Sequence, residues 1–440
     1  MIKLGCRNLP SINSLMDLFL GIDFGTTGVR TSVINQNKEE IINHSVSITS
    51  PILKRQQVCQ DPRLWWEALI QNLTYIKNKI DFKNIKRLSI DGTSGTVLVT
   101  NQDGDPLTYA LMYNDASAVE EAELVEKISS GHPILSSPSN ALVRTLSLLK
   151  DQKFHNYKIL HQADWVASKI IGEFKFSDEN NSLKLGYDCS LRVWPDWFSK
   201  LPIDLDSLPK VVTPGQTIGM LNNQDLLDLG FSKNLEVVAG TTDSIAAFLA
   251  TGANKIGEAV TSIGTTLVVK TISDKAIFDK KIGIYSHRLG NRWLAGGASN
   301  VGGKILKEKF NDRISELSTK INPDKLLNLN YYPLTTKGER FPINDPDKMP
   351  KLEPKPNNEI DFFQAILEGI TSVEKLSYNK INEIGGEYPK KIYTVGGGSK
   401  NILWNEIRKK ILKVELEVAL SVDASFGSAL LASGDINFND

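Results

Sequence analysis

The sequence predicts an α/β protein of two domains. Its 440 residues exceed the size at which a single hydrophobic core usually stops growing. Short apolar, strand-like runs alternate with amphipathic helical stretches along the chain. A Gly-Thr-Thr turn precedes a strand twice, at residues 25–27 and 264–266, which indicates two halves built on one plan.

The N-terminal half is expected to begin with a tail and a strand pair. Residues 1–16 lack periodicity, so we expect a dispensable tail. LFLGID, a Gly-Thr-Thr-Gly turn and VRTSVIN predict a β-hairpin or the start of a meander. An amphipathic helix follows in DPRLWWEALIQNLTYIKNKI, with Asp61 as N-cap, Pro62 at the first helical position and core-facing Trp65 and Trp66. KRLSIDGTSGTVLVTNQDG then predicts two strands around a Gly-rich turn.

The second half repeats this pattern from about residue 235. VVAGTTD predicts a strand, SIAAFLATGA a helix, and GEAVTSIGTTLVVKT two strands around the second Gly-Thr-Thr. The helix EIDFFQAILEGITSVEKLSYNKIN precedes a strand, a Gly-rich turn and a helix in KKIYTVGGGSKNILWNEIRKKIL. We therefore divide the chain into a tail at 1–16, one domain at 17–240 and another at 241–440.

Composition favours a small or neutral partner. The 51 basic and 51 acidic residues cancel, which gives no electrostatic argument for nucleic acid or an anionic membrane. The 3 cysteines are widely spaced without a CxxC pair, so a reducing, cytoplasmic location without disulfides is expected. No apolar run approaches the roughly 18 residues that span a bilayer. Oligomeric state has no signal in the sequence.

The first candidate site is the GIDFGTTGVR segment. Asp23 ends an apolar strand, where an acid is costly unless it is paired or metal-bound. Residues 25–28 form a turn of small residues, whose backbone N–H groups can cradle phosphate oxygens. The segment is not a P-loop, because GxxxxGK[ST] is absent and a strand follows the turn. A plain tight hairpin is the structural alternative.

Several motifs, in order, resemble those of the FGGY carbohydrate kinases, within the actin and hexokinase superfamily. DFGTTGVR resembles the family's first phosphate motif, VVAGTTDSIAAFLATGA the segment with its catalytic aspartate, and TSIGTTLVV its second phosphate loop. YTVGGGSKNILWNEI resembles its adenosine motif and SVDASFGSALLASG its closing helix. The resemblance spans residue 18 to the C-terminus and implies two actin-like, ribonuclease H-like domains with an interdomain cleft.

The resemblance also implies a site for ATP and Mg²⁺. Asp243 becomes the general base, although without the resemblance a plain helix N-cap is the simpler interpretation. Asp23 would hold Mg²⁺ through water. Residues expected to bind ATP are Thr26, Thr27, Gly264, Thr265, Thr266, Gly303, Gly397, Gly398, Asn401 and Trp404. Hairpin turns at the glycines and a core position for Trp404 are the structural alternatives.

The sugar is expected to contact Asp23, Ser94, Gly95 and Asp243, with a second polar cluster at residues 113–115. Xylulose kinases usually carry Gln-Met-His-Gly, and glycerol kinases Asn-Gln-Arg-Glu, where this chain has residues 93–96, Thr-Ser-Gly-Thr. In this it resembles the short bacterial and plant-type D-ribulose kinases. The expected reaction is ATP-dependent phosphorylation of D-ribulose to D-ribulose 5-phosphate. D-Xylulose kinase activity and a non-catalytic, actin-like ATP-binding protein are the alternatives.

Overall fold

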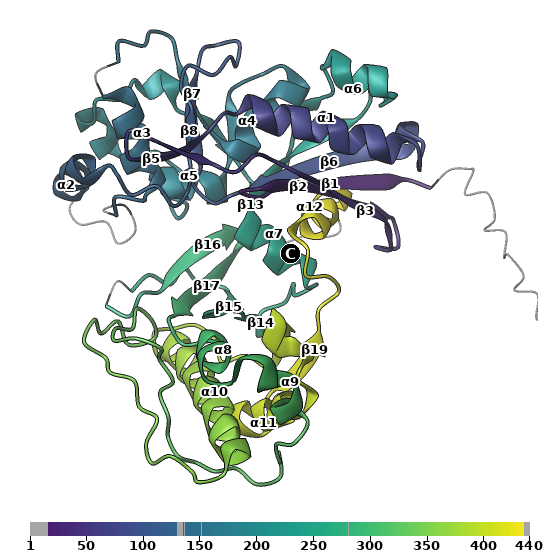
Figure 1. Ribbon diagram of the computed structural model, residues 1–440. Coiled ribbons are helices and arrows are strands. Elements are labelled where there is room, and N and C mark those ends of the chain that lie inside the picture. Colours follow the sequence, from purple (N-terminus) through teal and green to yellow (C-terminus); the bar gives the residue numbers. More distant parts are fainter. Residues whose placement is uncertain (1–15, 130–134, 136, 151, 280, 435–440) are drawn as a thin grey trace, which may run out of the picture.

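A computed structural model describes residues 16–129, 135, 137–150, 152–279 and 281–434. It has two lobes, stacked one above the other in Figure 1, each with a central β-sheet flanked by helices. The fold is therefore α/β with two domains, as predicted. The expected dispensable tail at residues 1–16 lies, apart from Met16, outside the described residues.

The upper sheet combines an antiparallel meander with parallel neighbours. β1 pairs antiparallel with β2 and β2 with β3, while β6 lies parallel to β1, and β13 parallel to β6. The strand order is β12-β13-β6-β1-β2-β3, with β1 at Leu18–Phe24, β2 at Gly28–Asn35, β3 at Glu40–Ser47, β6 at Ile85–Gly92, β12 at Thr217–Met220 and β13 at Glu236–Thr242. The predicted domain boundary between residues 240 and 241 falls inside β13.

The lower sheet repeats this plan. β14 and β15 form an antiparallel hairpin, and β18 and then β19 add in parallel beside β14. The order is β16-β17-β15-β14-β18-β19, with β14 at Glu258–Ile263, β15 at Leu267–Ser273, β16 at Tyr285–Leu289, β17 at Arg292–Ser299, β18 at Lys391–Val395 and β19 at Glu415–Val418. The two-halves prediction, based on the repeated Gly-Thr-Thr, is confirmed.

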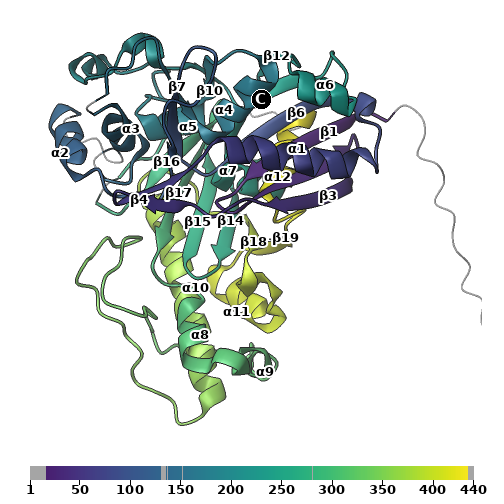
Figure 2. The same ribbon diagram turned by 45° about the horizontal axis from the view of Figure 1, so that its top comes forward.

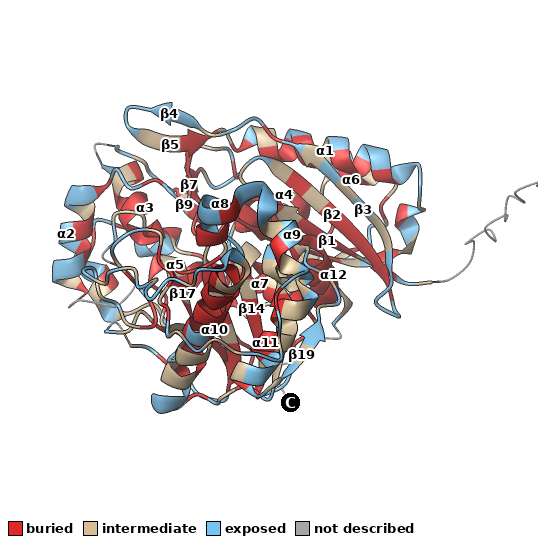
Figure 3. Cartoon of the chain, turned by 60° about the horizontal axis from the view of Figure 1, so that its bottom comes forward, coloured by how far each residue is buried: buried red, intermediate tan, exposed pale blue. Residues whose placement is uncertain are grey.

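Helices cover both faces of each sheet (Figures 1 and 2). α1 and α4 pack on one face of the upper sheet, and α8, α10 and α11 on one face of the lower. The helices are α1 Arg63–Lys77, α2 Val119–Ile128, α3 Ala141–Leu149, α4 Gln162–Ile171, α5 Glu179–Leu185, α6 Gln224–Leu229, α7 Asp243–Ala250, α8 Lys304–Phe310, α9 Ile314–Ser318, α10 Glu359–Glu383, α11 Ile402–Leu412 and α12 Ala424–Ser433. Buried residues run through the middle of both lobes in Figure 3.

Smaller elements complete the upper lobe and its connections. A side sheet has the order β4-β5-β8-β7-β9, with β4 at Ile52–Lys54, β5 at Gln57–Gln60, β7 at Val97–Thr100, β8 at Ala110–Leu111 and β9 at Lys158–His161, and β10 (Phe176–Asp178) pairs with β11 (Lys210–Val212). Short 3₁₀ helices are η1 Phe82–Asn84, η2 Asp196–Lys200, η3 Leu205–Ser207, η4 Asn311–Arg313 and η5 Gly397–Lys400.

Helices α7 and α12 lie between the two sheets and join the lobes. Ile245, Phe248 and Leu249 of α7 pack against the lower sheet, each such burial stabilising the fold by about 1.5–3 kcal/mol. α12 packs on α7 and on the face of β1 opposite α1. A Cβ on Gly427 would lie 1.8 Å from the carbonyl oxygen of Ala246, so only glycine permits this approach.

Of two local predictions, the strands around the Gly-rich turn are confirmed and the N-cap of α1 is wrong. β6 and β7 flank the Gly-rich turn as expected, but they belong to different sheets, because the chain leaves the upper sheet after Gly92. Pro62, not Asp61, is the N-cap of α1, while Asp61 Oδ1 accepts a hydrogen bond from the Arg63 N–H at 3.0 Å. Trp65 and Trp66 are buried in the core, as predicted.

Among the described residues, no helix is both long enough and apolar enough to cross a bilayer. Cys59 and Cys189 are buried free thiols.

Candidate active site

A pocket of about 650 Å³ opens in the lower lobe, at the ends of β14 and β18. Its walls come from the two strand-end loops and from α8, α9, α10 and α11. It brings together residues that the sequence placed in separate motifs: Gly264, Thr265, Gly303, Gly397, Gly398, Asn401 and Trp404. Thr266 and the upper-lobe residues Thr26 and Thr27 do not line it.

The pocket is open because its loops are built from glycine. The Gly264 N–H donates to the Thr266 carbonyl at 3.1 Å, which closes the β14–β15 turn, and the Gly303 N–H donates to the Gly264 carbonyl at 2.7 Å. A Cβ on Gly302 would lie 2.5 Å from the Thr265 carbonyl oxygen. Side chains would therefore separate these loops and fill the space between them.

Asn401 and Trp404 each have a structural role besides lining the pocket. Asn401 caps α11, its Oδ1 accepting from the Trp404 N–H at 3.0 Å, and its Nδ2 donates to Ser318 Oγ at 2.9 Å. The Trp404 indole N–H donates to Thr371 Oγ1 at 2.9 Å, and the side chain is 2 % exposed. Trp404 is thus a core residue whose ring edge also forms pocket wall.

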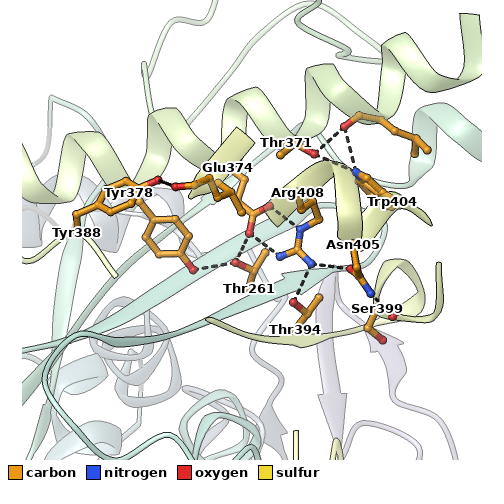
Figure 4. A network of polar contacts seen from close by, with 12 residues as sticks. Thr261, Thr371, Glu374, Tyr378, Tyr388, Thr394, Ser399, Trp404, Asn405 and Arg408 are labelled. Atoms are coloured by element: carbon orange, nitrogen blue, oxygen red, sulfur yellow. Dashed lines mark hydrogen bonds and ion pairs between the residues drawn. The ribbon is translucent and has the colours of Figure 1, made fainter. Parts of the chain in front are cut away.

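A buried ion pair supports this wall from behind (Figure 4). Arg408 Nε and Nη2 donate to the Glu374 carboxylate at 2.9 and 2.7 Å, and neither side chain is exposed. Arg408 Nη1 donates to Asn405 Oδ1 at 3.0 Å, and Asn405 Nδ2 donates to the Ser399 carbonyl at 2.9 Å. The chain of hydrogen bonds therefore ends on the loop that carries Gly397 and Gly398.

Acidic side chains gather where β1 and β6 end in the upper lobe. Asp23 is paired in register with Asp91 of β6 on one side and with Arg30 of β2 on the other. Asp91 is fully buried and accepts from Ser428 Oγ of α12 at 2.5 Å. Burial and the neighbouring Asp23 raise the pKa of Asp91 well above its usual range. Burial also raises the pKa of Asp23, against the opposing effects of Asp91 and Arg30.

Asp243 is the first residue of α7, one position past the N-cap Thr242, so it is not the cap itself. Its Oδ1 accepts from the Ser244 N–H at 2.6 Å. Burial, followed by the negative charge of Asp23, raises the pKa of Asp243 to about 6, although Lys270 and Lys184 act in the opposite direction. A carboxylate with this pKa can take up a proton near neutral pH.

The predicted sugar turn lies between β6 and β7. Thr93 and Thr96 face inward, where their hydroxyls share a 2.6 Å hydrogen bond, and Thr93 also donates to Gln162 Oε1 at 2.8 Å. The Gly95 carbonyl accepts from Arg144 Nη2 at 2.7 Å, and Ser94 is partly exposed. Of the second cluster, Asp115 is buried and accepts from the Val58 N–H at 2.6 Å, a structural contact.

The titratable residues around Asp23 and Asp243 were largely missed from the sequence: Arg30, Asp91, Lys184, Lys270 and His287. Asp91 did carry a signal, because it stands at the second-to-last position of an apolar strand just as Asp23 does. Lys270 stands in the apolar strand LVVKTIS and is half-buried beside the first turn of α7, with desolvation lowering its pKa to about 8. Nothing in the local sequence separates such a lysine from one that points into solvent.

Comparison with known proteins identifies the family. The N-terminal domain model of the FGGY family of carbohydrate kinases matches residues 18–250, and the C-terminal domain model matches residues 259–434. A xylulose kinase of Staphylococcus xylosus is 24% identical over 96% of this chain and 92% of its own length. A gluconokinase of Bacillus subtilis is 23% identical over 96% and 88%.

Solved structures share the fold. A xyloylose kinase from Brucella ovis superimposes with a TM-score of 0.84 at 19% identity, covering 94% of this chain and 90% of that one. A Plasmodium falciparum glycerol kinase with ADP gives a TM-score of 0.81 at 19% identity, covering 96% and 90%. With both domain models matched in order along nearly the whole described chain, the protein belongs to the FGGY family of carbohydrate kinases and is a phosphotransferase with an alcohol acceptor.

Proposed function

We propose that this kinase phosphorylates D-ribulose to D-ribulose 5-phosphate with ATP and Mg²⁺. The observation that carries the proposal is the position of Asp243, an acid with a pKa raised to about 6 at the start of a helix packed between the two sheets. Residues 17–240 would bind the sugar and residues 241–440 the nucleotide. Asp243 would accept the proton of the attacking sugar hydroxyl.

The lower-lobe pocket fits a nucleotide in size and construction. Gly397, Gly398, Asn401 and Trp404 would line the adenosine part, and Gly264, Thr265 and Gly303 would leave their backbone open toward the phosphates. Thr266 and the upper-lobe residues Thr26 and Thr27 would contact the phosphates when the lobes close. Closure would exclude water, so that the phosphoryl group goes to the sugar.

The residues at the end of β1 fit a magnesium ion. Asp23 lies beside Asp91, whose Oδ1 is buried with no hydrogen-bond partner among the described residues, and carboxylate oxygens are the ligands that Mg²⁺ prefers. We propose that Asp23 holds the ion through water. When bound, the ion would neutralise charge on the phosphates.

The choice of sugar depends on residues 93–96. The hydroxyls of Thr93 and Thr96 are already engaged inside the fold, so Ser94 and Gly95 would face the sugar together with Asp23 and Asp243. This turn offers neither the histidine of xylulose kinases nor the arginine of glycerol kinases. D-Xylulose is the second candidate, because several relatives are named xylulose kinases.

The test is kcat/KM for D-ribulose, D-xylulose, L-ribulose, glycerol and D-gluconate on one preparation. Unpaired buried polar groups cost about 1–3 kcal/mol each, so a preference of roughly 5- to 150-fold for D-ribulose is expected. A higher value for D-xylulose would replace the D-ribulose assignment. A rate of ATP hydrolysis that does not change when any of these sugars is added would favour the alternative of an actin-like ATP-binding protein that does not phosphorylate a sugar.

A further inference from the structure

A polar wall of the lower lobe faces the upper lobe beside Asp243. It consists of Tyr285 and His287 on β16, and Lys184 of α5 reaches it from the upper lobe. Lys184 Nζ donates to Tyr285 Oη at 3.3 Å and lies 4.6 Å from the centre of the Tyr285 ring. The contact therefore connects α5 of the upper lobe with β16 of the lower lobe, which lie next to each other in Figure 1.

His287 has an unused polar atom in this wall. The side chain is 5% exposed, and its Nε2 has no hydrogen-bond partner among the described residues. Burial and the charges of Lys184 and Lys270 lower the pKa of His287 well below its usual value, so the ring is neutral. A buried polar atom left unpaired is unfavourable, which points to a ligand oxygen as its missing partner.

The wall is close to both the proposed base and the proposed sugar turn. Lys270, Gly296 and Tyr285 lie in one row across β15, β17 and β16, and Lys270 Nζ donates to the Ser244 carbonyl at 2.5 Å, next to Asp243. On the other side, a Cβ built on Gly95 would lie 3.8 Å from Lys184 Cβ. A sugar placed between Ser94 and Asp243 would therefore meet this wall.

The charges of the region favour a neutral ligand. The positive charges of Lys184 and Lys270 are balanced by the negative charges of Asp23 and Asp243, and Asp243 lies close enough to interact with both lysines and with Asp23. His287 adds no charge. A carboxylate would bring an unmatched negative charge into a buried site, whereas a hydroxyl or carbonyl oxygen can accept from Lys184 or Tyr285 without one. A hydroxyl can also pair with His287 Nε2 in either tautomer of the neutral ring.

We propose that Lys184, Tyr285 and His287 form a subsite that binds an uncharged hydroxyl or carbonyl oxygen of the acceptor sugar. The subsite rests on the proposed sugar-kinase function, but not on which ketose is preferred. It makes the lower lobe part of the sugar site, and it makes sugar binding depend on a contact between the lobes.

The experiment measures steady-state kinetics of full-length Lys184→Met, Tyr285→Phe and His287→Phe, each checked for folding by its melting temperature. Lys184→Met and Tyr285→Phe keep the shape of the side chain, so they remain informative if His287→Phe fails to fold. Each variant should lower kcat/KM for the preferred sugar at least tenfold, mainly through KM, with KM for ATP within twofold of wild type. Lys210→Met is the matched control, since Lys210 is exposed and lies 5.9 Å from the Phe176 ring.

Retention of sugar kcat/KM within twofold in both Lys184→Met and Tyr285→Phe would overturn the subsite, as would equal increases of KM for sugar and ATP. If the wild type prefers D-gluconate and Lys184→Met loses that preference, the proposal that the subsite binds an uncharged oxygen would be overturned. If the wild type prefers D-xylulose, the D-ribulose assignment fails. The subsite is then tested by the same variant kinetics with D-xylulose as the substrate. If the protein shows no turnover with any sugar, sugar binding is measured by calorimetry in the presence of a non-hydrolysable ATP analogue. Absence of sugar binding in that measurement would overturn the subsite.

Discussion

Asp243 differs from the other acids of the cleft in what surrounds its carboxylate. Asp91 is fully buried and held by Ser428, and Asp23 lies between Asp91 and Arg30. Asp243 accepts the Ser244 N–H, and lysines approach it from both lobes. This is the environment expected of a base that must lose and regain a proton.

Replacement of Asp243 by Asn should lower sugar-dependent turnover by about 10²- to 10⁴-fold, because the amide cannot accept the hydroxyl proton. ATP affinity, measured by calorimetry, should change less than threefold. Asp225→Asn is the control, since Asp225 also lies in the first turn of a helix, α6, and accepts from the Trp66 indole at a distance from the cleft. An Asp243→Asn enzyme with more than half of wild-type turnover would remove Asp243 from the mechanism.

The acid limb of the pH profile should reflect the same residue. Asp243 acts as a base only when ionised, and its pKa is raised to about 6, so kcat/KM should fall about tenfold per pH unit below pH 6 and level off above it. The measurement is kcat/KM for the preferred sugar from pH 5 to 8 at saturating Mg²⁺ and ATP. A profile flat down to pH 5 would contradict the assignment.

Among single residues, the sequence indicated those in turns better than those in strands. Gly264, Gly397 and Asn401 stand in turns whose small residues carry a local signal, and the pocket brings them together. Lys270 and His287 stand in ordinary strands, and the groups near them, the Ser244 carbonyl of α7 and Lys184 of α5, come from distant segments. That information is tertiary, so no local pattern contains it.

Among the elements, α11 connects the pocket to the interior of the lower lobe. Its first turn carries Asn401 and Trp404 toward the pocket, and Arg408, further along, reaches Glu374 of α10. Asn405 stands between them and holds the Ser399 carbonyl. The strand–loop–helix order was predictable from KKIYTVGGGSKNILWNEI, but the partner of Arg408 was not, because Glu374 lies 34 residues away.

Asn405→Ala should therefore raise KM for ATP about three- to tenfold, because it frees the loop at Gly397 and Gly398 while leaving the Arg408–Glu374 pair in place. KM for the sugar should stay within twofold. Asn379→Ala, on the neighbouring α10, is a control for general effects on the lobe. Equal effects on both KM values would argue against a role confined to the loop.

For the whole molecule, the repeated sheet plan was predictable because the same Gly-Thr-Thr hairpin starts each half. Strand pairing was predictable only where a tight turn joins neighbours, as in β1–β2 and β14–β15. For β6 and β7 the turn is Gly-rich but the strands separate, since β6 pairs with β1 and β13 instead. Parallel pairing is set by contacts distant in sequence, which local periodicity does not record.

The junction of the lobes should be sensitive to side-chain size at Gly427. Its Cβ position lies 1.8 Å from the Ala246 carbonyl oxygen, so Gly427→Val must push α12 away from α7. Overpacking of this kind costs about 1–3 kcal/mol or more, and the melting temperature should fall by several degrees. Ala247→Val, at a partly exposed position on α7, should change it far less. An unchanged melting temperature for Gly427→Val would show that α12 can shift freely.

The packing of α12 on β1 also has a consequence for how the chain is made. Phe24 ends β1 and Ala424 begins α12, so the strand and the helix that covers it lie 400 positions apart in the sequence. At a synthesis rate of roughly 5–20 residues per second, the nascent chain carries this face of β1 uncovered for about 20–80 s. Phe19 and Ile34 lie on the side of the sheet that α12 shields in the finished protein. Emergence of α12 from the ribosome, and not synthesis of the earlier parts of the upper lobe, is therefore the event that allows this face of the first sheet to be covered.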